Sequence, residues 1–490
     1  MSKNGGAEPR HVRVAIIGSG FAGLGTAIRL KNKGISNFVI LERASDLGGV
    51  WRDNSYPNCA CDVQSHLYSF SFARNTEWTR SFSPQPEIWS YLRSCAERFG
   101  IAQNIAYDHE VLALDWDEQQ KVWRIETSKE NFTADLVVAA TGGLSEPAIP
   151  KLPGLGSFAG TTFHSSHWRH DFDLAGKRVA VIGTGASAIQ FVPAIQPKVE
   201  KLFLIQRTPP WIMPRNDQAI SDRTKIVLRK SKTAQLMIRG GIYASREVLA
   251  LPFFYPWIAK IVQSRALRHL EMSVSDPALR KKLTPSYTLG CKRILLSDDY
   301  LPSLTKPNVE VVASAVTEVR PHSIVTADGS EHEVDAIIFG TGFQVQDYPL
   351  AKKTRGKNGE LLAASWKSRM TAHLGTTVHG FPNLFFLMGP NTALGHSSVI
   401  VMIESQIEHF LNALEYMEKN HLETIEPSRE AQRTFVEEID EKTAGTVWAS
   451  GGCASWYLDK TRQNTTLWPG FTFSFMRRTA RFDADEYRVA

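Results

Sequence analysis

Two glycine-rich segments of this sequence have the residue types and spacing that bind the pyrophosphate of a dinucleotide. The first is Gly18-Ser19-Gly20-Phe21-Ala22-Gly23. Gly18 permits a tight turn, Gly20 lets the backbone approach a pyrophosphate, and Gly23 lets a helix pack closely on a strand. Backbone N–H groups at the start of that helix then bind the anion. Glu42 lies nineteen residues after Gly23 and can accept a hydrogen bond from a ribose hydroxyl, so this segment predicts an FAD site.

The second segment is Gly183-Thr184-Gly185-Ala186-Ser187-Ala188, in which alanine replaces the third glycine, as the pattern allows. Nineteen residues after Ala188 the acid is replaced by Arg207, which is followed by Thr208. A cation and a hydroxyl at this place favour a 2′-phosphate and therefore NADPH over NADH. The alternative is an exposed arginine at the end of a strand.

Buried parallel strands are expected to position both segments. Apolar runs over 12–17 and 179–182 precede them, and helical spacing follows each, with Pro193 expected to limit or kink the second helix. Two more strands, over 136–140 and 336–339, run into glycines where the chain would cross between domains. These crossings bring further backbone close to a cofactor; they contribute Thr141, Gly142, Thr341 and Gly342 to the predicted cofactor-binding residues.

The order of these segments predicts an α/β fold of two nested Rossmann-like dinucleotide-binding domains, one for FAD and one for NADP. Residues 1–145 and 345–490 are expected to form the FAD domain, and residues 146–216 and 287–344 the NADP domain. Residues 217–286 contain few strand signals and are predicted to form a helical insertion.

Composition excludes several classes of protein. Of the 490 residues 43% are hydrophobic and 22% charged, so a disordered or fibrous chain is excluded. The net charge is only +6, and no basic run contains interleaved aromatics, so no nucleic-acid partner is expected. Residues 1–10 are polar and do not form a signal peptide. The apolar run 248–259 contains two prolines and is too short for a transmembrane segment; it is interpreted as a buried helical segment, with a membrane-surface patch as the alternative.

The five cysteines are few, odd in number and widely spaced, which favours free thiols in a reducing cytoplasm over a disulfide framework. Cys59 and Cys61 have no second Cys/His pair at zinc spacing. His164, His167 and His170 recur at intervals of three but have no carboxylate or thiolate to complete a site. No metal is therefore predicted.

Further segments carry a resemblance to a known family. The segment 158–168, Phe-Ala-Gly-Thr-Thr-Phe-His-Ser-Ser-His-Trp, resembles the fingerprint of Baeyer–Villiger monooxygenases, although Arg169 follows where the family usually has Pro or Asp. Gly48-Gly49-Val50-Trp51, Tyr56-Pro57-Asn58 and Asp62 resemble its second signature, with Asn58 at a place that is usually Gly or Met. The resemblance covers residues 12–480. It implies that His164 and Trp168 are hinge residues between the two domains.

The family's reaction implies roles for individual residues. NADPH reduces FAD, O2 gives a flavin C4a-peroxide, and this peroxide converts a ketone to an ester or lactone. Because the peroxide must stay an anion, a fixed cation beside it is required. The resemblance assigns this role to Arg293, with Asp62 as its partner and Lys292 as a second contact to the 2′-phosphate. Trp456 would fold over NADP.

The resemblance and the glycine motifs together complete the predicted cofactor site. The remaining predicted cofactor-binding residues are Arg43, Gly49, Val50, Trp51, Tyr56, Asp62, Val63, Tyr68 and Val111.

The sequence leaves two alternative functions. A flavin-containing monooxygenase that oxidises sulfur or nitrogen would use a protonated hydroperoxide and would have less use for Arg293. An NADPH sensor or disulfide reductase is the rival from another class, but Cys59-x-Cys61 has the wrong spacing for a redox pair. The sequence does not specify the ketone or the oligomeric state.

Overall fold

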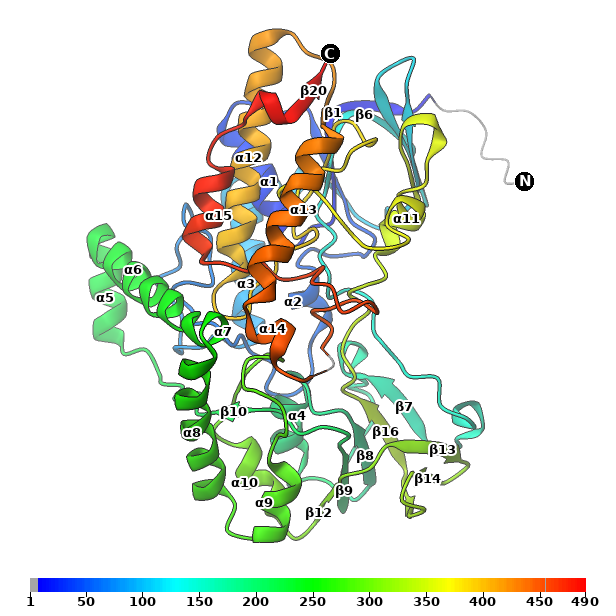
Figure 1. Cartoon of the computed structure of the whole chain (residues 1–490), viewed down its shortest axis with the longest axis vertical. Helices are drawn as coiled ribbons and strands as arrows, with labels where there is room; N and C mark the ends of the chain where they lie inside the picture. Colours follow the sequence, from blue (N-terminus) through cyan, green and yellow to red (C-terminus); the bar gives the residue numbers. More distant parts are fainter. Residues whose placement is uncertain (1–7, 454) are drawn as a thin grey trace.

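Two sheets, one for each glycine-rich segment, organise the computed structural model, which describes residues 8–453 and 455–490. In Figure 1 they lie in two lobes, the first sheet above and the second below, with helices packed around them. Most of the polar segment 1–10 lies outside the described residues.

The first sheet has the strand order β17-β4-β5-β6-β1-β2-β3, and β18 also pairs with β6. Strand β1 is parallel to both β2 and β6, while β4 and β5 form an antiparallel hairpin. The central residues of β1 are fully buried, as expected for a parallel strand covered on both faces. Its strands are β1 (Arg10–Ile17), β2 (Phe38–Leu41), β3 (Ile105–Ala106), β4 (Val111–Asp117), β5 (Val122–Thr127), β6 (Phe132–Ala139), β17 (Thr354–Arg355) and β18 (Leu384–Phe386).

Helices from both ends of the chain surround this sheet. The long buried helix α12 packs on α1, so a C-terminal helix covers the helix that follows the first glycine-rich segment. The helices are α1 (Phe21–Asn32), α2 (Val50–Asp53), α3 (Gln85–Arg98), α11 (Leu362–Ser365), α12 (Val399–Asn420), α13 (Arg429–Ala444), α14 (Val447–Ser450) and α15 (Thr472–Thr479); β19 (Ile425–Pro427) and β20 (Tyr487–Val489) pair beside them.

The second sheet is wholly parallel, in the order β12-β9-β8-β16-β7. Helix α4 begins at Ala188, the last residue of the second glycine-rich segment, and continues past Pro193 for two residues, so the proline does not break it. The elements of this lobe are β7 (Thr161–His164), β8 (Arg178–Ile182), α4 (Ala188–Ile195), β9 (Lys201–Ile205), β10 (Ile212–Met213), β11 (Leu295–Leu296), α10 (Tyr300–Leu304), β12 (Val309–Val312), β13 (Val316–Arg320), β14 (Ser323–Thr326), β15 (Glu331–Glu333) and β16 (Ala336–Phe339).

The two crossings between the lobes pair with each other. Ala148 N–H donates to the carbonyl of Gly342 at 2.9 Å, and the Thr341 hydroxyl donates to the carbonyl of Ala148 at 2.6 Å. Pro147 and Phe343 form an antiparallel bridge beside them. The two crossings therefore lie side by side, and so do the glycines at which they begin. The predicted domain boundaries at 145, 216, 286 and 344 stay predictions.

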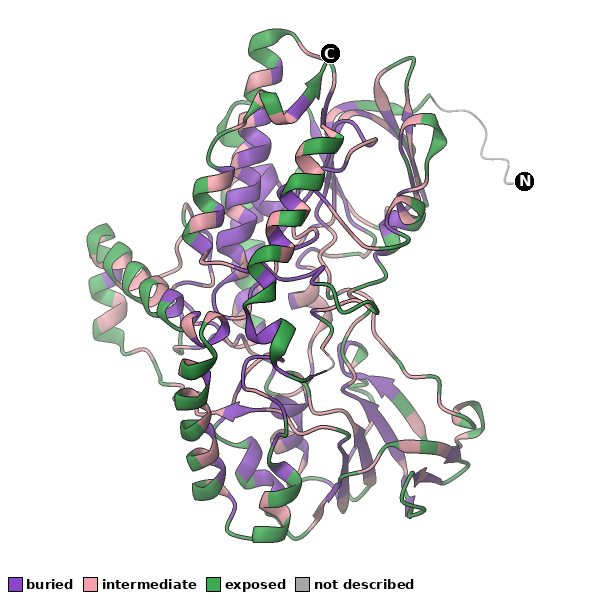
Figure 2. Cartoon of the chain, in the orientation of Figure 1, coloured by how far each residue is buried: buried purple, intermediate pink, exposed green. Residues whose placement is uncertain are grey.

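Residues 217–286 are helical, with α5 (Asp222–Lys230), α6 (Lys232–Val248), α7 (Leu251–Phe254), α8 (Pro256–Ser273) and α9 (Pro277–Leu283). Helices α5 and α6 project from the body at the left of Figure 1 and are largely exposed in Figure 2. The interpretation of 248–259 as buried is only partly right, because Phe253 is buried while Val248 and Trp257 are 62% and 65% exposed. Among the described residues, no helix combines the length and apolarity that crossing a membrane requires.

The expectation of free thiols throughout is wrong for two of the five cysteines. Cys291 and Cys453, 162 residues apart, form a disulfide, while Cys59, Cys61 and Cys95 are buried thiols. Wide spacing in sequence concealed the pair, because only the tertiary fold brings the 291 segment against the C-terminal loop.

This disulfide predicts a stability effect. Reduction, or Cys453→Ser, should lower the free energy of unfolding by about 2–5 kcal/mol, since the bridge closes a long loop in the unfolded chain. Thermal unfolding with and without reductant measures the loss, and Cys95→Ser is the control at a buried thiol. Thiol titration of the denatured, unreduced protein should find three thiols; five would contradict the pairing.

Candidate active site

The first glycine-rich segment is closed tightly enough to exclude any side chain at two positions. Gly18 has φ +104°, and a Cβ there would lie 2.8 Å from the carbonyl oxygen of Ala140. A Cβ on Gly23 would lie only 1.9 Å from the carbonyl oxygen of Gly18. A Cβ on Gly20 would be 3.9 Å from the Cα of Gly49, so space remains there. The segment therefore presents bare backbone at the start of α1, as a pyrophosphate requires.

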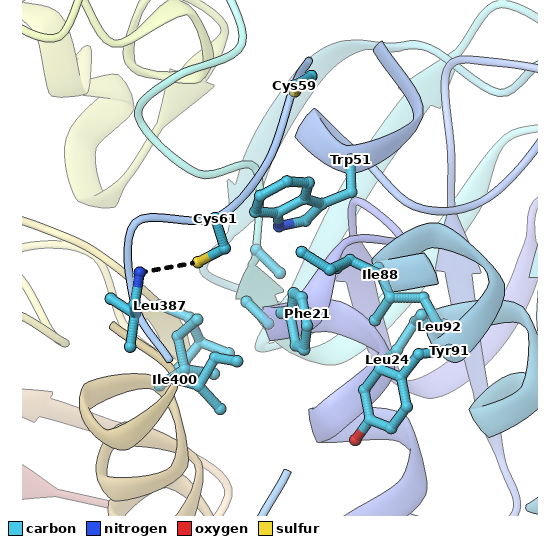
Figure 3. Packing of buried hydrophobic residues seen from close by; sticks show 14 of the residues in the cluster. Phe21, Leu24, Trp51, Cys59, Cys61, Ile88, Tyr91, Leu92, Leu387 and Ile400 are labelled. Carbon is cyan, nitrogen blue, oxygen red and sulfur yellow. Dashed lines mark hydrogen bonds between the residues drawn. The ribbon is translucent and has the colours of Figure 1, made fainter. Parts of the chain in front are cut away.

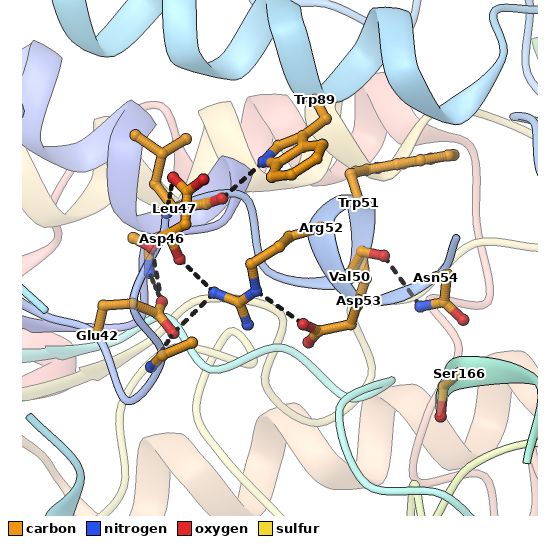
Figure 4. Close-up of polar contacts among 12 residues, drawn as sticks. Glu42, Asp46, Leu47, Val50, Trp51, Arg52, Asp53, Asn54, Trp89 and Ser166 are labelled. Carbon is orange, nitrogen blue, oxygen red and sulfur yellow. Dashed lines mark hydrogen bonds and ion pairs between the residues drawn. The ribbon is translucent and has the colours of Figure 1, made fainter. Parts of the chain in front are cut away.

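Glu42 holds this segment in place. One carboxylate oxygen accepts from the N–H and hydroxyl of Ser19 at 3.0 and 2.6 Å. The other accepts from Ala44 N–H at 3.0 Å and from Arg52 Nη1 at 3.1 Å. Figure 4 shows Arg52 directed at Glu42. All four acceptor positions of the carboxylate are therefore in use. A ribose hydroxyl that binds Glu42, as predicted, would replace one of these donors, and the Ser19 hydroxyl can rotate away.

The second glycine-rich segment repeats the geometry of the first. Gly183 has φ +107°, and a Cβ there would lie 2.4 Å from the carbonyl oxygen of Gly340. The Thr184 hydroxyl lies 3.4 Å from the carbonyl of Thr208, which ties the segment to the loop after β9. Gly340, at the start of one crossing between the lobes, therefore packs against this segment as Ala140 packs against the first.

Arg207 and Lys292 form a positive site beside the second segment. Burial lowers the pKa of the Lys292 ammonium, and the nearby charge of Arg207 lowers it further. Neither side chain forms an ion pair with a carboxylate of the described residues. Two adjacent cations without a protein anion make a site for a phosphate group.

A single cavity of about 1220 Å³ connects the two segments. That is larger than the roughly 300–1,000 Å³ of a pocket for one small ligand. Every residue predicted to bind a cofactor lines it except Gly23, which packs behind the segment. On the first-sheet side its wall is aromatic: Trp51 Nε1 donates to the Tyr68 hydroxyl at 3.0 Å, and Figure 3 shows Trp51 and Phe21 in one buried cluster with Cys61 and Ile400.

Asp62 and Arg293 form an ion pair in the same cavity. Arg293 Nε and Nη2 lie 2.7 and 2.6 Å from one carboxylate oxygen, Oδ2, and Nη1 lies 3.3 Å from the carbonyl of Leu394. Burial acts to raise the pKa of Asp62, but the guanidinium of Arg293 outweighs it, so that pKa is lowered. Asp62 in turn raises the pKa of Arg293 against the effect of burial. Both groups are therefore charged, and they retain 26% and 29% exposure toward the cavity.

The histidines of 164–170 are used in local hydrogen bonds. His164 Nδ1 and His167 Nδ1 lie 2.8 and 3.0 Å from the Ser166 hydroxyl, and His170 Nε2 lies 2.8 Å from the Ser55 hydroxyl. Burial lowers the pKa of His164 to about 4, so it is neutral at pH 7. In the described part of the chain, no group of three or more His, Cys, Asp or Glu side chains is placed to hold a metal ion.

Residues 385–397 contribute both to the cavity wall and to the core. Ala393, Leu394 and Ser397 line the cavity, while Phe385 and Phe386 are fully buried core residues. Trp456 lines the cavity and is 42% exposed, and its carbonyl accepts from Gln346 Nε2 at 3.1 Å. The disulfide ties the loop before Trp456 to the segment that carries Lys292 and Arg293.

Comparison with known proteins identifies the family. Residues 11–374 match the flavin-binding monooxygenase-like family. The chain is 52% identical over 98% of its length to a Baeyer–Villiger monooxygenase of Streptomyces coelicolor, covering 93% of that protein. It is 50% identical over 99% of its length to one of Pseudomonas aeruginosa, covering 92% of that protein. The chain belongs to the Baeyer–Villiger monooxygenases.

Solved structures agree with this family. The structure of OTEMO in complex with FAD and NADP is 25% identical and superposes with a TM-score of 0.90, over 99% of this chain and 100% of that one. Cyclohexanone monooxygenase from Rhodococcus bound to NADP+ is 27% identical, with a TM-score of 0.87 over 98% and 99%. The predicted fold class and the resemblance found in the sequence are confirmed.

Sequence reasoning missed polar residues that support this Baeyer–Villiger monooxygenase site. On α4, Gln190 accepts from Ala60 N–H at 3.2 Å and donates to its carbonyl at 3.0 Å, joining the two lobes at the 56–60 loop. Arg215 Nη2 donates to the carbonyl of Cys61 at 2.9 Å. A glutamine inside the apolar run 188–195 was a usable signal for Gln190; Arg215 offered none.

Proposed function

We propose that this protein is an FAD- and NADPH-dependent Baeyer–Villiger monooxygenase that uses O2 to convert a ketone to an ester or lactone. The observation that carries the proposal is the charged Asp62–Arg293 pair in the cavity that both glycine-rich segments line. Sequence identity of 50–52% to named Baeyer–Villiger monooxygenases supports the same reaction.

The residues present fit both cofactors. Positions 18 and 183 leave no room for a Cβ, and both glycine-rich segments line the cavity. Arg207 and Lys292 add the charge that distinguishes a 2′-phosphate from a hydroxyl. FAD at the first segment and NADPH at the second would therefore meet across the cavity. When bound, FAD supplies the redox chemistry that takes two electrons from NADPH and activates O2.

The chain contributes binding, orientation and charge. Asp62 fixes the guanidinium of Arg293 through two contacts to one oxygen, and the carbonyl of Leu394 holds a third nitrogen. Arg293 thereby places a permanent positive charge where negative charge develops on oxygen, without reorganisation during the reaction. One atom of O2 enters the ketone and the other leaves as water, with NADPH and one proton consumed.

A decisive test combines NADPH oxidation with product analysis. The protein should oxidise NADPH faster with a ketone present and form a product 16 mass units heavier than the ketone, by insertion of one oxygen atom. Sulfoxide or N-oxide formation without any ester would favour the electrophilic monooxygenase, and NADPH oxidation unchanged by any organic substrate would favour a redox or sensor protein. A panel of linear, cyclic and aromatic ketones would identify the class of substrate.

Cofactor preference is predicted to depend on Arg207. Arg207→Gln should raise the KM for NADPH about ten- to hundredfold, the scale of one charge-assisted contact, and change the KM for NADH little. Arg169→Gln is the matched control, because Arg169 is an exposed arginine that pairs with Asp171. An equal loss with both nucleotides would show that Arg207 does not contact the 2′-phosphate.

We also propose that the enzyme acts in the cytoplasm, where NADPH is regenerated, and binds no nucleic acid. The modest net charge of +6 supports the absence of a nucleic-acid partner. The three buried thiols support the cytoplasmic location. Disulfides are rare in the cytoplasm. A thiol titration of freshly lysed cells should therefore examine whether the Cys291–Cys453 disulfide forms there.

A further inference from the structure

Helix α6 of the insertion directs two arginines at the loop that carries Asp62. Arg239 and Arg246 are seven residues apart, about two helical turns, and so lie on one face of α6. Both are largely buried, with 11% of the Arg239 side chain and 8% of Arg246 exposed. Both reach residues of the 62–69 loop, which also carries Tyr68 of the cavity wall.

The two arginines differ in what they contact. Arg239 Nη1 donates to the carbonyls of His66, Leu67 and Ser69 at 3.0–3.2 Å, and its Nη2 is 4.0 Å from the Glu404 carboxylate. Arg246 Nε donates to Gln64 Oε1 at 2.6 Å, and its Nη2 lies 3.4 Å from the carbonyl of Asp62. Within the described residues no carboxylate oxygen lies within 4.0 Å of Arg246.

A buried guanidinium without its own carboxylate needs a compensating charge. The main charge that compensates Arg246 is that of Asp62: burial lowers the pKa of Arg246, the Asp62 carboxylate opposes this, and the like charge of Arg293 lowers the pKa further. Arg246 in turn helps Arg293 to lower the pKa of Asp62. One carboxylate thus serves two arginines. The Asp62–Arg293 pair alone is neutral, whereas the three groups together carry a net charge of +1.

We propose that Arg246 is a positioning residue that holds the Asp62–Gln64 turn and supplies the second positive charge, so that Asp62, Arg293 and Arg246 together present a net charge of +1 to the cavity. The proposal rests on the function proposed above. It gives the helical insertion a role in the site, although Arg246 does not line the cavity itself.

The test compares one pair of variants at Arg246 with a control on the same helix. Arg246→Gln removes the charge, Arg246→Lys keeps it, and Arg239→Gln removes an equally buried arginine that contacts loop carbonyls. The primary readout is the midpoint potential of the bound flavin at pH 7, because a nearby positive charge favours the reduced, more negative flavin. Ester formed per NADPH consumed and the thermal unfolding midpoint are measured on the same preparations.

Arg246→Gln should lower the midpoint potential and reduce the yield of ester per NADPH by roughly tenfold, the scale of one partly screened unit charge. Arg246→Lys should restore both at pH 7. Arg239→Gln should lower the unfolding midpoint and leave the potential and the yield unchanged. A potential that moves equally in Arg246→Gln and Arg239→Gln, or that Arg246→Lys does not restore, would overturn the proposal.

The lysine variant also provides a test that does not depend on folding of Arg246→Gln. A buried lysine loses its proton at high pH, whereas arginine keeps it. The ionisable groups around position 246 are Asp62, Arg293 and the Cys61 thiol, with Glu247 adjacent on α6. Burial raises the pKa of Cys61, so above pH 8 the new lysine is the group expected to titrate. The potential of Arg246→Lys should then fall below that of the parent, and parallel curves would contradict the role of the charge. Because the potential is measured without a ketone, failure of this inference is distinct from failure of the proposed reaction.

Discussion

Arg293→Ala is expected to reduce ester formation by about 10²- to 10³-fold while FAD stays bound. The variant loses the fixed cation that faces the reacting oxygen, and removal of one charge-stabilising group of this kind costs about 3–4 kcal/mol of barrier. FAD binding should persist because the Gly18 segment and Glu42 keep their own hydrogen bonds, which do not involve Arg293. NADPH should still be consumed, more slowly, with hydrogen peroxide released in place of ester. Stopped-flow absorbance follows the reduction of the flavin by NADPH, and chromatography quantifies the ester.

Matched controls separate charge from structural damage. Arg369→Ala removes another largely buried arginine, which pairs with the partly exposed Asp440, but Arg369 does not line the cavity. It should destabilise the protein and leave ester per NADPH unchanged. Asp62→Ala should reduce ester formation less than Arg293→Ala, since the guanidinium remains. Ester formation near the parent rate in Arg293→Ala would mean that this arginine is not the catalytic one.

Gly23→Ala is expected to abolish FAD binding. The new Cβ would lie 1.9 Å from the carbonyl oxygen of Gly18, so the segment must open or α1 must move away from β1. Either shift removes the backbone geometry that binds the pyrophosphate. The purified variant should be colourless, and the flavin-to-protein absorbance ratio after incubation with excess FAD measures the defect.

A glycine-to-alanine substitution at the exposed position 240 should instead stabilise the protein. Gly240 lies on an exposed face of α6, and a Cβ there meets nothing within 4 Å. Gly240→Ala should raise the free energy of unfolding by about 0.5–1 kcal/mol and leave the flavin content unchanged. If Gly23→Ala retained full flavin, close packing at that position would not be a requirement of the site.

The sequence by itself determined the features that depend on local pattern. Glycines at 18, 20 and 23 and at 183 and 185, each after a buried strand, predicted two dinucleotide segments, and the residue nineteen positions on separated Glu42 from Arg207. Such patterns can be recognised in a sequence because a turn, a strand and a helix start are built from neighbours in the chain. The resemblance added Asp62 and Arg293, which the fold brings within 2.6 Å across 231 residues of sequence.

The tertiary structure decided what depends on distant partners. No spacing in the sequence relates Cys291 to Cys453 or Arg246 to Asp62, since each contact joins segments that meet only when the lobes and the insertion pack. The exposure of Val248 and Trp257 was equally hidden, because an apolar residue is buried only if another element covers it. Glu42 illustrates both cases. Its residue type and position could be identified in the sequence, but the four donors that fill its acceptor positions come from the folded loop around it.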